Sequence, residues 1–477
     1  MFKEPGKLES EGVAATAGRE SELRTIVGVT VGLLLLVGIG FWLPFDLAGA
    51  ALNGLDPVKV RLGLGICACV AVLWFTEALP LAITALLVPV LAYSCGLMDM
   101  KEALAGFSDP LIFLFFGGFA IAAALSGQGL DRWMAHRIVR LGKGDFLSVC
   151  YLLFGVTAAI SMWVSHTATT AMMLPLALAI LQQMPSDEGS SRNAVFMLLG
   201  VAYSASVGGI GTLVGTPPNG IAAAQLGIGF VDWLKFGIPA MLILLPLLVV
   251  VLRRVCRPEN LTIPDLKKLE FSFNRSRVMT LAIFGLTAAG WILSEPLAQW
   301  LGTTGSFNTL VALVAVLALV ASGVLRWQEL KTGTDWGILL LFGGGITLST
   351  LIGRTGAGLF MARLFANWVE FWPVPLIVAA VIFFMIFLTE LISNTALTAL
   401  MVPIFFLIAG ELGIEPKKLI LPLTIAASTG FMMPVGTPPN ALVFATGKIP
   451  QREMMRVGLI LNLVFVVALT IVSEILF

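Results

Sequence analysis

Two short polar clusters interrupt long apolar stretches of the chain. Ser-His-Thr at 165–167 lies near the middle of the stretch 146–182, and Ser-Asn-Thr at 393–395 lies near the middle of 373–410. Each apolar stretch is too long for one membrane crossing, which takes about 20 residues. The clusters therefore predict two hairpins that enter a membrane and return by the same face, although a single crossing for each stretch stays open.

A further hydroxyl precedes each cluster by four residues. Ser161 stands before Ser165, and Thr389 stands before Ser393. Residues four apart on a helix lie on one face, so the two oxygens of a pair can face one point. Hydroxyl, amide and carbonyl oxygens without a carboxylate suit Na⁺ better than a divalent metal. For one such pair taken alone, the ordinary alternative is a hydroxyl that bonds back to its own helix.

The segment Gly-Thr-Pro-Pro-Asn occurs twice, at 215–219 and at 436–440. Two prolines remove two N–H donors and glycine permits unusual dihedral angles, so a helix must stop there. At membrane depth such backbone is tolerated only where it is buried in protein or lines a cavity. Freed carbonyls can coordinate a cation, and helix N-termini favour an anion. Both segments are therefore candidate ion-binding sites.

The composition requires a membrane. Of 477 residues 58% are hydrophobic and 12% are charged, against about 25% charged residues in a soluble domain. A water-soluble enzyme is thereby excluded, and a net charge of +1 argues against a nucleic-acid partner. Two histidines cannot form a multi-histidine metal site, and five cysteines without a C-x-x-C pair indicate neither zinc nor a disulfide framework. We expect an all-α polytopic membrane protein.

The motifs belong to an internal repeat. Residues 165–175 align with 393–403 at an offset of 228, with seven of eleven positions identical, and the Gly-Thr-Pro-Pro-Asn segments repeat at an offset of 221. Upstream, Phe-Gly-Gly at 116–118 recurs at 342–344. With most of the basic residues placed in cytoplasmic loops, the N-terminus lies inside and the two copies enter the membrane from opposite faces. An inverted-topology repeat of this kind places a transport site near the midplane, between the copies.

The expected architecture is about 11 transmembrane helices plus two re-entrant hairpins. Its segments are a cytoplasmic N-terminal segment (1–25), a first helix and linker (26–59), repeat 1 (60–255, with hairpin 146–182 and broken helix 194–230), a cytoplasmic linker (256–277) and repeat 2 (278–477, with hairpin 373–410 and broken helix 419–445).

At these motifs the chain resembles the divalent anion/sodium symporter family, which contains sodium–dicarboxylate, citrate and sulfate cotransporters. The resemblance covers residues 60–477 and rests on the paired hairpin clusters and the paired Gly-Thr-Pro-Pro-Asn segments. It implies a homodimer in the bilayer, in which each protomer has a scaffold domain and a transport domain that moves as an elevator. It also implies a transporter of the inner (plasma) membrane, not an enzyme, with Na⁺ as the co-transported ion and no organic cofactor.

The resemblance assigns roles to individual residues. Its implied ligands are Ser161, Ser165, His166 and Gly211 for a first Na⁺ site; Thr389, Asn394 and Ala427 for a second Na⁺ site; and Thr167, His166, Ser393, Asn394, Thr395, Thr216 and Thr437 for a dianionic substrate.

One position departs from the family pattern, because His166 stands where the family usually has asparagine. A neutral imidazole still offers one donor and one acceptor, whereas a protonated one repels Na⁺ and attracts a carboxylate. We expect sodium-driven uptake of a C4-dicarboxylate such as succinate, malate or fumarate. Proton coupling or anion exchange on the same fold, with citrate or sulfate as substrate, is the alternative, and an anion channel is the alternative from another class.

Overall fold

The computed structural model describes residues 23, 25–42, 51–142, 144–184, 188–262, 272–302 and 306–476. The chain divides into two compact units. The first unit comprises residues 1–107, 340–370 and 399–412, and the second comprises 108–339, 371–398 and 413–477. Most of the expected N-terminal segment, and residues 263–271 of the expected linker, lie outside the described residues.

Helices form the fold of the described residues, which contain no named strand, only an isolated bridge between Asp145 and Thr262. By length and composition seven helices can cross a membrane, or nine if two bent helix pairs each count as one span. The expected all-helical class is confirmed, while the expected number of about 11 crossings stays a prediction. One of the bent pairs is Arg275–Ile292 with Ser294–Trp300, between which the chain bends by 78°.

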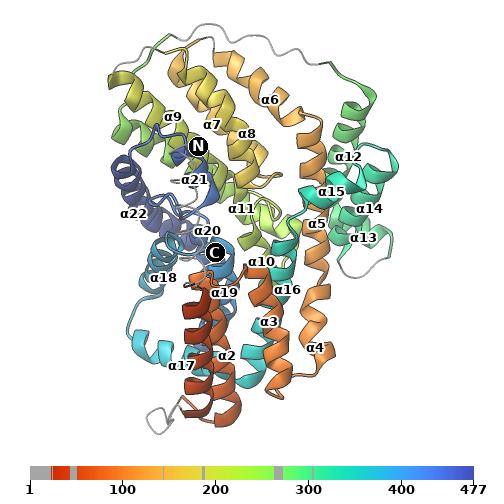
Figure 1. The fold of residues 1–477 in the computed structure, drawn as a ribbon, viewed down its shortest axis with the longest axis vertical. Helices are drawn as coiled ribbons and strands as arrows, with labels where there is room; N and C mark the ends of the chain where they lie inside the picture. Colours follow the sequence, from red (N-terminus) through yellow and green to blue (C-terminus); the bar gives the residue numbers. More distant parts are fainter. Residues whose placement is uncertain are drawn as a thin grey trace, which may run out of the picture. The chain divides into compact units, whose positions relative to one another are not determined.

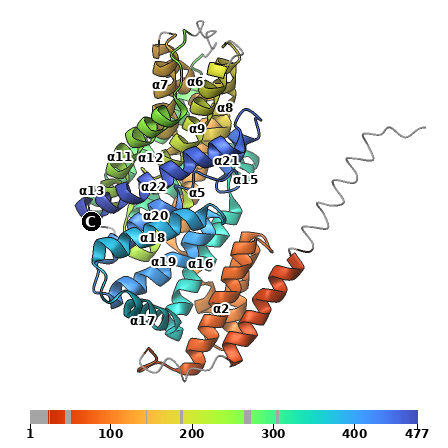
Figure 2. The same ribbon diagram turned by 90° about the vertical axis from the view of Figure 1, so that its left-hand side faces the viewer.

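The first unit contains several long helices (Figure 2). It contains the helix Thr25–Trp42, α2 (Pro57–Thr76), α3 (Leu81–Ser94), α4 (Met100–Ala105), α17 (Ala357–Val369), and parts of α16 (Trp336–Thr355) and α19 (Asn394–Glu411). The Thr347 hydroxyl donates to the Ala103 carbonyl at 2.9 Å, and Arg354 pairs with Glu102 at 2.5 Å. These contacts fasten α16 to α4.

In the second unit, α7 (Phe146–Ser161), α8 (His166–Leu181) and α9 (Glu188–Gly209) run side by side (Figure 1). Asp145 caps α7 by accepting the N–H of Ser148, and Ser165 caps α8 by accepting the N–H of Ala168. These side chains satisfy N–H groups that a helix start leaves free. The polar cluster at 165–167 therefore opens α8, directly after a turn.

A second group of packed helices consists of α18 (Val374–Thr389), α20 (Pro416–Ala427) and α22 (Gln451–Leu476), seen as the blue elements of Figure 2. The chain leaves α18, makes a turn at 390–393 and starts α19 at Asn394. The arrangement parallels that of α7 and α8. In both cases two apolar helices meet at the polar cluster.

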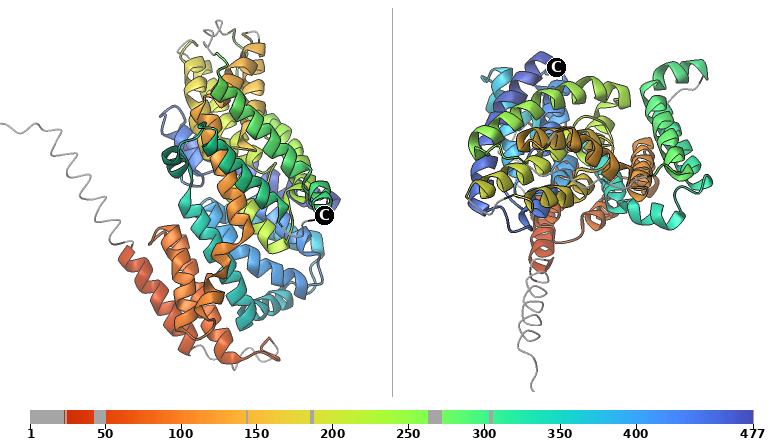
Figure 3. Two further views of the ribbon diagram at one scale, coloured as in Figure 1. Left: turned by 90° about the vertical axis from the view of Figure 1, so that its right-hand side faces the viewer. Right: turned by 90° about the horizontal axis from the view of Figure 1, so that it is seen from above.

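The remaining helices of this unit gather around α5 (Pro110–Gly127). They are α6 (Leu130–Val139), α12 (Arg275–Ile292), α13 (Ser294–Trp300), α14 (Phe307–Ala321) and α15 (Trp327–Gly333), of which 275–321 forms the green and teal group beside orange α5 in Figure 3. The helices α10 (Pro217–Leu226), α11 (Phe230–Cys256) and α21 (Pro438–Phe444) complete the unit. Close packing of α5 on α14 depends on Gly117, since a Cβ there would lie 2.6 Å from the Ala312 Cβ.

Gly117→Ala tests this contact. We expect a loss of about 1–3 kcal/mol of stability, because the added methyl meets backbone as well as side-chain atoms of Ala312. The measurement is the thermal unfolding midpoint of the purified protein in detergent. Gly127→Ala in the same helix is the matched control, because its Cβ meets nothing within 4 Å. Equal midpoints for the two variants would contradict the prediction.

Candidate functional site

The candidate site is built around two helix breaks in the second unit. After α9 ends at Gly209, residues 210–216 are not helical until α10 begins at Pro217; we call 210–216 the first break. After α20 ends at Ala427, residues 428–437 are not helical until α21 begins at Pro438; we call 428–437 the second break. Both restarts use the paired prolines, whose fixed φ and missing N–H suit the first turn of a helix.

The backbone enters the two restarts in the same conformation. Thr216 has φ −149° and ψ 143°, and Thr437 has φ −143° and ψ 149°. A close approach also requires glycine in the first break, where a Cβ on Gly215 would lie 2.4 Å from the Gly209 carbonyl oxygen. The repeated sequence thus produces a repeated local structure.

Each break is held by the asparagine that ends its Gly-Thr-Pro-Pro-Asn segment. The Asn219 amide donates to the carbonyls of Gly209 and Thr212 at 2.9 and 2.8 Å. The Asn440 amide donates to the carbonyls of Gly430 and Met433 at 3.1 and 3.0 Å. In both copies the two accepting carbonyls belong to residues that precede the asparagine by ten and seven positions. These amides replace part of the hydrogen bonding that the helix gives up at the break.

The structure brings the three residues of the expected second Na⁺ site together. The Thr389 hydroxyl oxygen lies 2.8 Å from Asn394 Oδ1 and 2.9 Å from the Ala427 carbonyl oxygen. All three residues are buried. A hydroxyl carries one proton, so it can donate to only one of these two oxygens at a time. The cluster is therefore rich in oxygen lone pairs and poor in donors.

Beside this cluster lies an additional hydroxyl. Ser428 follows Ala427 directly, is 3% exposed, and its Oγ has no hydrogen-bond partner among the described residues. A buried polar atom without a partner is costly in an apolar surrounding. Its position at the start of the second break makes it a further candidate ligand, and it was not among the residues predicted from the sequence.

The four residues of the expected first Na⁺ site are arranged differently. The Ser161 hydroxyl donates to the Ala205 carbonyl in α9 at 2.6 Å, and Ser165 Oγ accepts the N–H of Ala168 as the cap of α8. The N–H of Gly211 donates to the Gly208 carbonyl. His166 is partly buried. Hydrogen bonds between the four residues are absent from the described contacts, so this cluster is looser than the second.

The first hairpin turn is nevertheless tied to the first break. The Thr212 hydroxyl donates to the Met162 carbonyl, which comes directly after Ser161. In the second copy the position of Met162 is occupied by Glu390. The sequence pointed to the backbone near Gly211 but not to this hydroxyl.

The hydroxyls expected to meet a substrate differ in exposure. Thr216 and Thr437 are each 1% exposed, and Thr437 Oγ1 accepts the N–H of Asn440 whereas Thr216 Oγ1 has no partner among the described groups. Thr167, Ser393 and Thr395 are partly exposed at the starts of α8 and α19. The three partly exposed residues stand at helix N-termini, which favour negative charge.

Glu390 fastens the second break to the second hairpin turn. Its two carboxylate oxygens accept the N–H groups of Met432 and Met433 at 2.8 Å each, and Oε1 also accepts the Asn462 amide of α22 at 2.6 Å. Glu390 is 3% exposed, and no lysine or arginine pairs with it in the described part of the chain. Three donors therefore hold a buried carboxylate.

The copies pack across one another. Helix α21 of the second copy contacts α8 and α9 of the first, and α10 of the first copy contacts α20 of the second. The Tyr203 hydroxyl in α9 donates to the Phe431 carbonyl in the second break at 2.6 Å, with the rings 4.6 Å apart. Residues of both sequence copies thus form one polar region inside the second unit.

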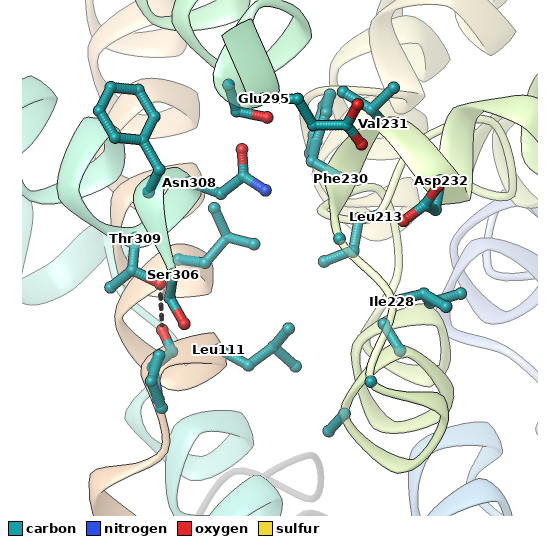
Figure 4. Close-up of a pocket in the computed structure, with 18 of the residues that line it drawn as sticks. Leu111, Leu213, Ile228, Phe230, Val231, Asp232, Glu295, Ser306, Asn308 and Thr309 are labelled. Carbon is teal, nitrogen blue, oxygen red and sulfur yellow. Dashed lines mark hydrogen bonds between the residues drawn. The ribbon is translucent and has the colours of Figure 1, made fainter. Parts of the chain in front are cut away.

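A cavity of about 430 Å³ near this region has a separate lining (Figure 4). Figure 4 shows Ser306, Asn308 and Thr309 on one wall and Ile228 and Asp232 on the other. Leu213 contributes from the first break, but none of the predicted site residues lines this cavity. We therefore do not assign the ion or substrate sites to it.

Several residues that organise the site were not predicted from the sequence. Gly430 precedes Asn440 by the same ten residues that separate Gly209 from Asn219, and this shared spacing was a usable signal. Asn462 stood out as an isolated amide in the apolar run of α22. Nothing in the sequence singled out Tyr203 or Ala205. Ala205 acts through its backbone carbonyl, which every residue type offers.

Comparison with known proteins gives the family. Residues 35–476 match the family model described as the sodium:sulfate symporter transmembrane region. An uncharacterized transporter of Haemophilus influenzae is 46% identical over 445 residues, covering 91% of this chain and 95% of that protein. The sodium-dependent dicarboxylate transporter SdcS of Staphylococcus saprophyticus is 32% identical over 451 residues, covering 86% of this chain and 84% of that protein.

A solved structure resembles the fold. The crystal structure of the Alcanivorax borkumensis YdaH transporter matches with a TM-score of 0.54 at 15% identity, covering 87% of this chain and 98% of that one. The match over residues 35–476 and the SdcS relative at 32% identity place the chain in the sodium:sulfate symporter family, the divalent anion/sodium symporter family that its paired motifs resemble.

Proposed function

We propose that this integral membrane transporter couples inward Na⁺ movement to the uptake of a divalent anion, a C4-dicarboxylate such as succinate, malate or fumarate. Membership of the family supports sodium-coupled anion transport, and SdcS relatives support a dicarboxylate. The observation that carries the proposal is the oxygen cluster of Thr389, Asn394 and Ala427.

A sodium ion fits this cluster on chemical grounds. Hydroxyl, amide and backbone carbonyl oxygens are ligands for a hard monovalent cation, and unwound helix ends supply such carbonyls in transporters. The three oxygens share one hydroxyl proton, so a cation would relieve the repulsion between their lone pairs. The first site would use Ser161, Ser165, His166 and the backbone at Gly211, with Thr212 and Ala205 holding these elements together.

The substrate would meet hydroxyls and helix starts instead of fixed cations. The clusters at 165–167 and 393–395 and the two Gly-Thr-Pro-Pro-Asn segments contain no lysine or arginine. A dianion moving inward against the potential costs about 2.3 kcal/mol per charge per 100 mV. Bound Na⁺ would supply the missing positive charge beside the substrate hydroxyls of Thr167, Ser393 and Thr395. Symport is therefore the mechanism that suits a site without fixed cations.

The family resemblance supports a larger arrangement, which we also propose. The protein would lie in the plasma membrane with a cytoplasmic N-terminus and form a homodimer, and residues 60–255 and 278–477 would be inverted repeats. The two hairpins and two broken helices would move together as a transport domain. The first hairpin, both broken helices and residues 373–398 of the second hairpin belong to one compact unit, which supports their movement as one body, whereas residues 399–410 of that hairpin belong to the other unit.

Uptake by proteoliposomes tests the function. We expect labelled succinate to accumulate when an inward Na⁺ gradient is imposed and not when only a pH gradient is imposed. Accumulation with the pH gradient alone would support proton coupling. Uptake that depends only on succinate loaded inside would indicate exchange, and flux that follows only the gradient of the anion itself would indicate a channel.

Thr389→Val tests the second cation site. The variant keeps the shape of the side chain but removes an oxygen ligand, and we expect the Na⁺ concentration for half-maximal uptake to rise about ten-fold or more. Thr424→Val is the matched control, since the Thr424 hydroxyl is equally buried and bonds only to the Ile420 carbonyl of its own helix. An unchanged Na⁺ dependence in Thr389→Val would remove this residue from the site.

Glu390→Gln tests how the second break is positioned. A glutamine presents an NH₂ group to one of the N–H donors that now bind the carboxylate, so we expect the break to shift and uptake at limiting Na⁺ to fall about ten-fold. Glu259→Gln is the control, because Glu259 forms a half-exposed ion pair with Arg192. If both variants transported like the parent, the break would not depend on this carboxylate.

A further inference from the structure

A second cavity in the same unit has apolar walls and a volume of about 480 Å³. It lies among α5, α6, α7 and α12, and Leu125, Met134, Val156, Leu281 and Phe284 are among its lining residues. None of the residues proposed to bind Na⁺ or substrate lines it. A dianion or a hydrated cation would lose its solvation there without compensation, so the cavity suits an apolar ligand.

The cavity follows helix α7 along most of its length. Lining residues recur on one face from Tyr151 through Gly155 and Ala159 to Ile160. The nine helical steps from residue 151 to residue 160 span about 14 Å, which is close to the roughly 15 Å depth of one leaflet of the hydrocarbon core. Gly155 and Ala159 are exposed, so α7 presents an open, small-residue surface to whatever fills the cavity. One extended acyl chain has the matching length and polarity.

A basic residue lies beside the end of the cavity that Tyr151 lines. Arg253, in the last turn of α11, lies with its guanidinium carbon 6.0 Å from the centroid of the Tyr151 ring. Arg253 forms no ion pair with any described acidic residue. A phosphate is the natural partner for a guanidinium at the level of lipid headgroups.

We propose that this cavity binds one anionic phospholipid, with an acyl chain along α7 and the phosphate at Arg253. The far end of the chain reaches Trp163, which lines the cavity and packs edge-on against Phe284 at 5.1 Å. The lipid therefore lies between the first hairpin and α12, and it is independent of which anion is transported.

Native mass spectrometry of the delipidated full chain tests this site with dioleoyl phosphatidylglycerol as the probe. Gly155→Leu is the informative variant, because a Cβ there meets nothing within 4 Å and the leucine fills the space of the chain. We expect the affinity of the tightest-bound lipid to fall about ten-fold or more. Gly285→Leu is the matched control, since Gly285 in α12 is equally open and does not line the cavity. Equal lipid binding by both variants would overturn the proposal.

Two further measurements locate the headgroup and the chain. Arg253→Gln should abolish a preference for phosphatidylglycerol over phosphatidylcholine while the binding of phosphatidylcholine is kept. A parent protein without that preference would refute the headgroup position. Phosphatidylglycerol brominated on its chain should quench the tryptophan fluorescence of the parent more than that of Trp163→Phe. Equal fractional quenching of the two proteins would show that the acyl chain does not reach Trp163. The quenching measurement remains a valid test even if Gly155→Leu fails to fold.

Discussion

The site depends on the cost of ending a helix inside an apolar protein. Both breaks leave carbonyls without their helical donors, and an unpaired buried carbonyl is expensive. Asn219 and Asn440 meet this constraint with one side chain each, since one amide group supplies two N–H donors to two carbonyls. Each amide keeps its Oδ1 without a partner among the described groups. The breaks are therefore held in shape while oxygen lone pairs stay free next to them.

The two copies differ in how the break is held to the hairpin turn. In the second copy Glu390 accepts two N–H groups of the break and the Asn462 amide, whereas in the first copy Met162 occupies that position and receives the Thr212 hydroxyl on its carbonyl. The second break is three residues longer and has more N–H groups to satisfy. A carboxylate suits this purpose, because it accepts several donors and brings a negative charge close to Thr389. The second copy also has Asn394 at the start of the second helix of its hairpin, where the first copy has His166. The tighter oxygen cluster is found in the copy that has both features.

Much of this arrangement was predictable from the sequence because it follows from local chemistry. Paired prolines must restart a helix, so the positions of α10 and α21 could be expected from 215–219 and 436–440. The polar clusters at 165–167 and 393–395 do open helices, and the all-helical class followed from composition. One contact through the backbone could not be predicted. The Ser161 hydroxyl bonds to the Ala205 carbonyl, and any residue type at 205 offers that group.

Packing between the copies has a consequence for coupling. Phe431 lies in the second break, one residue from the Met432 N–H that Glu390 holds, and its carbonyl receives the Tyr203 hydroxyl from α9 of the first copy. Tyr203 stands two residues before Ala205, the partner of Ser161. A cation that pulls the Ala427 carbonyl and the start of the second break toward Thr389 would therefore act on a segment that is bonded to the first copy. The path runs through hydrogen bonds of 2.6 to 2.9 Å between buried groups, so a displacement at one end cannot be absorbed by water. The two halves of the sequence need no direct contact between their proposed cation ligands to influence each other.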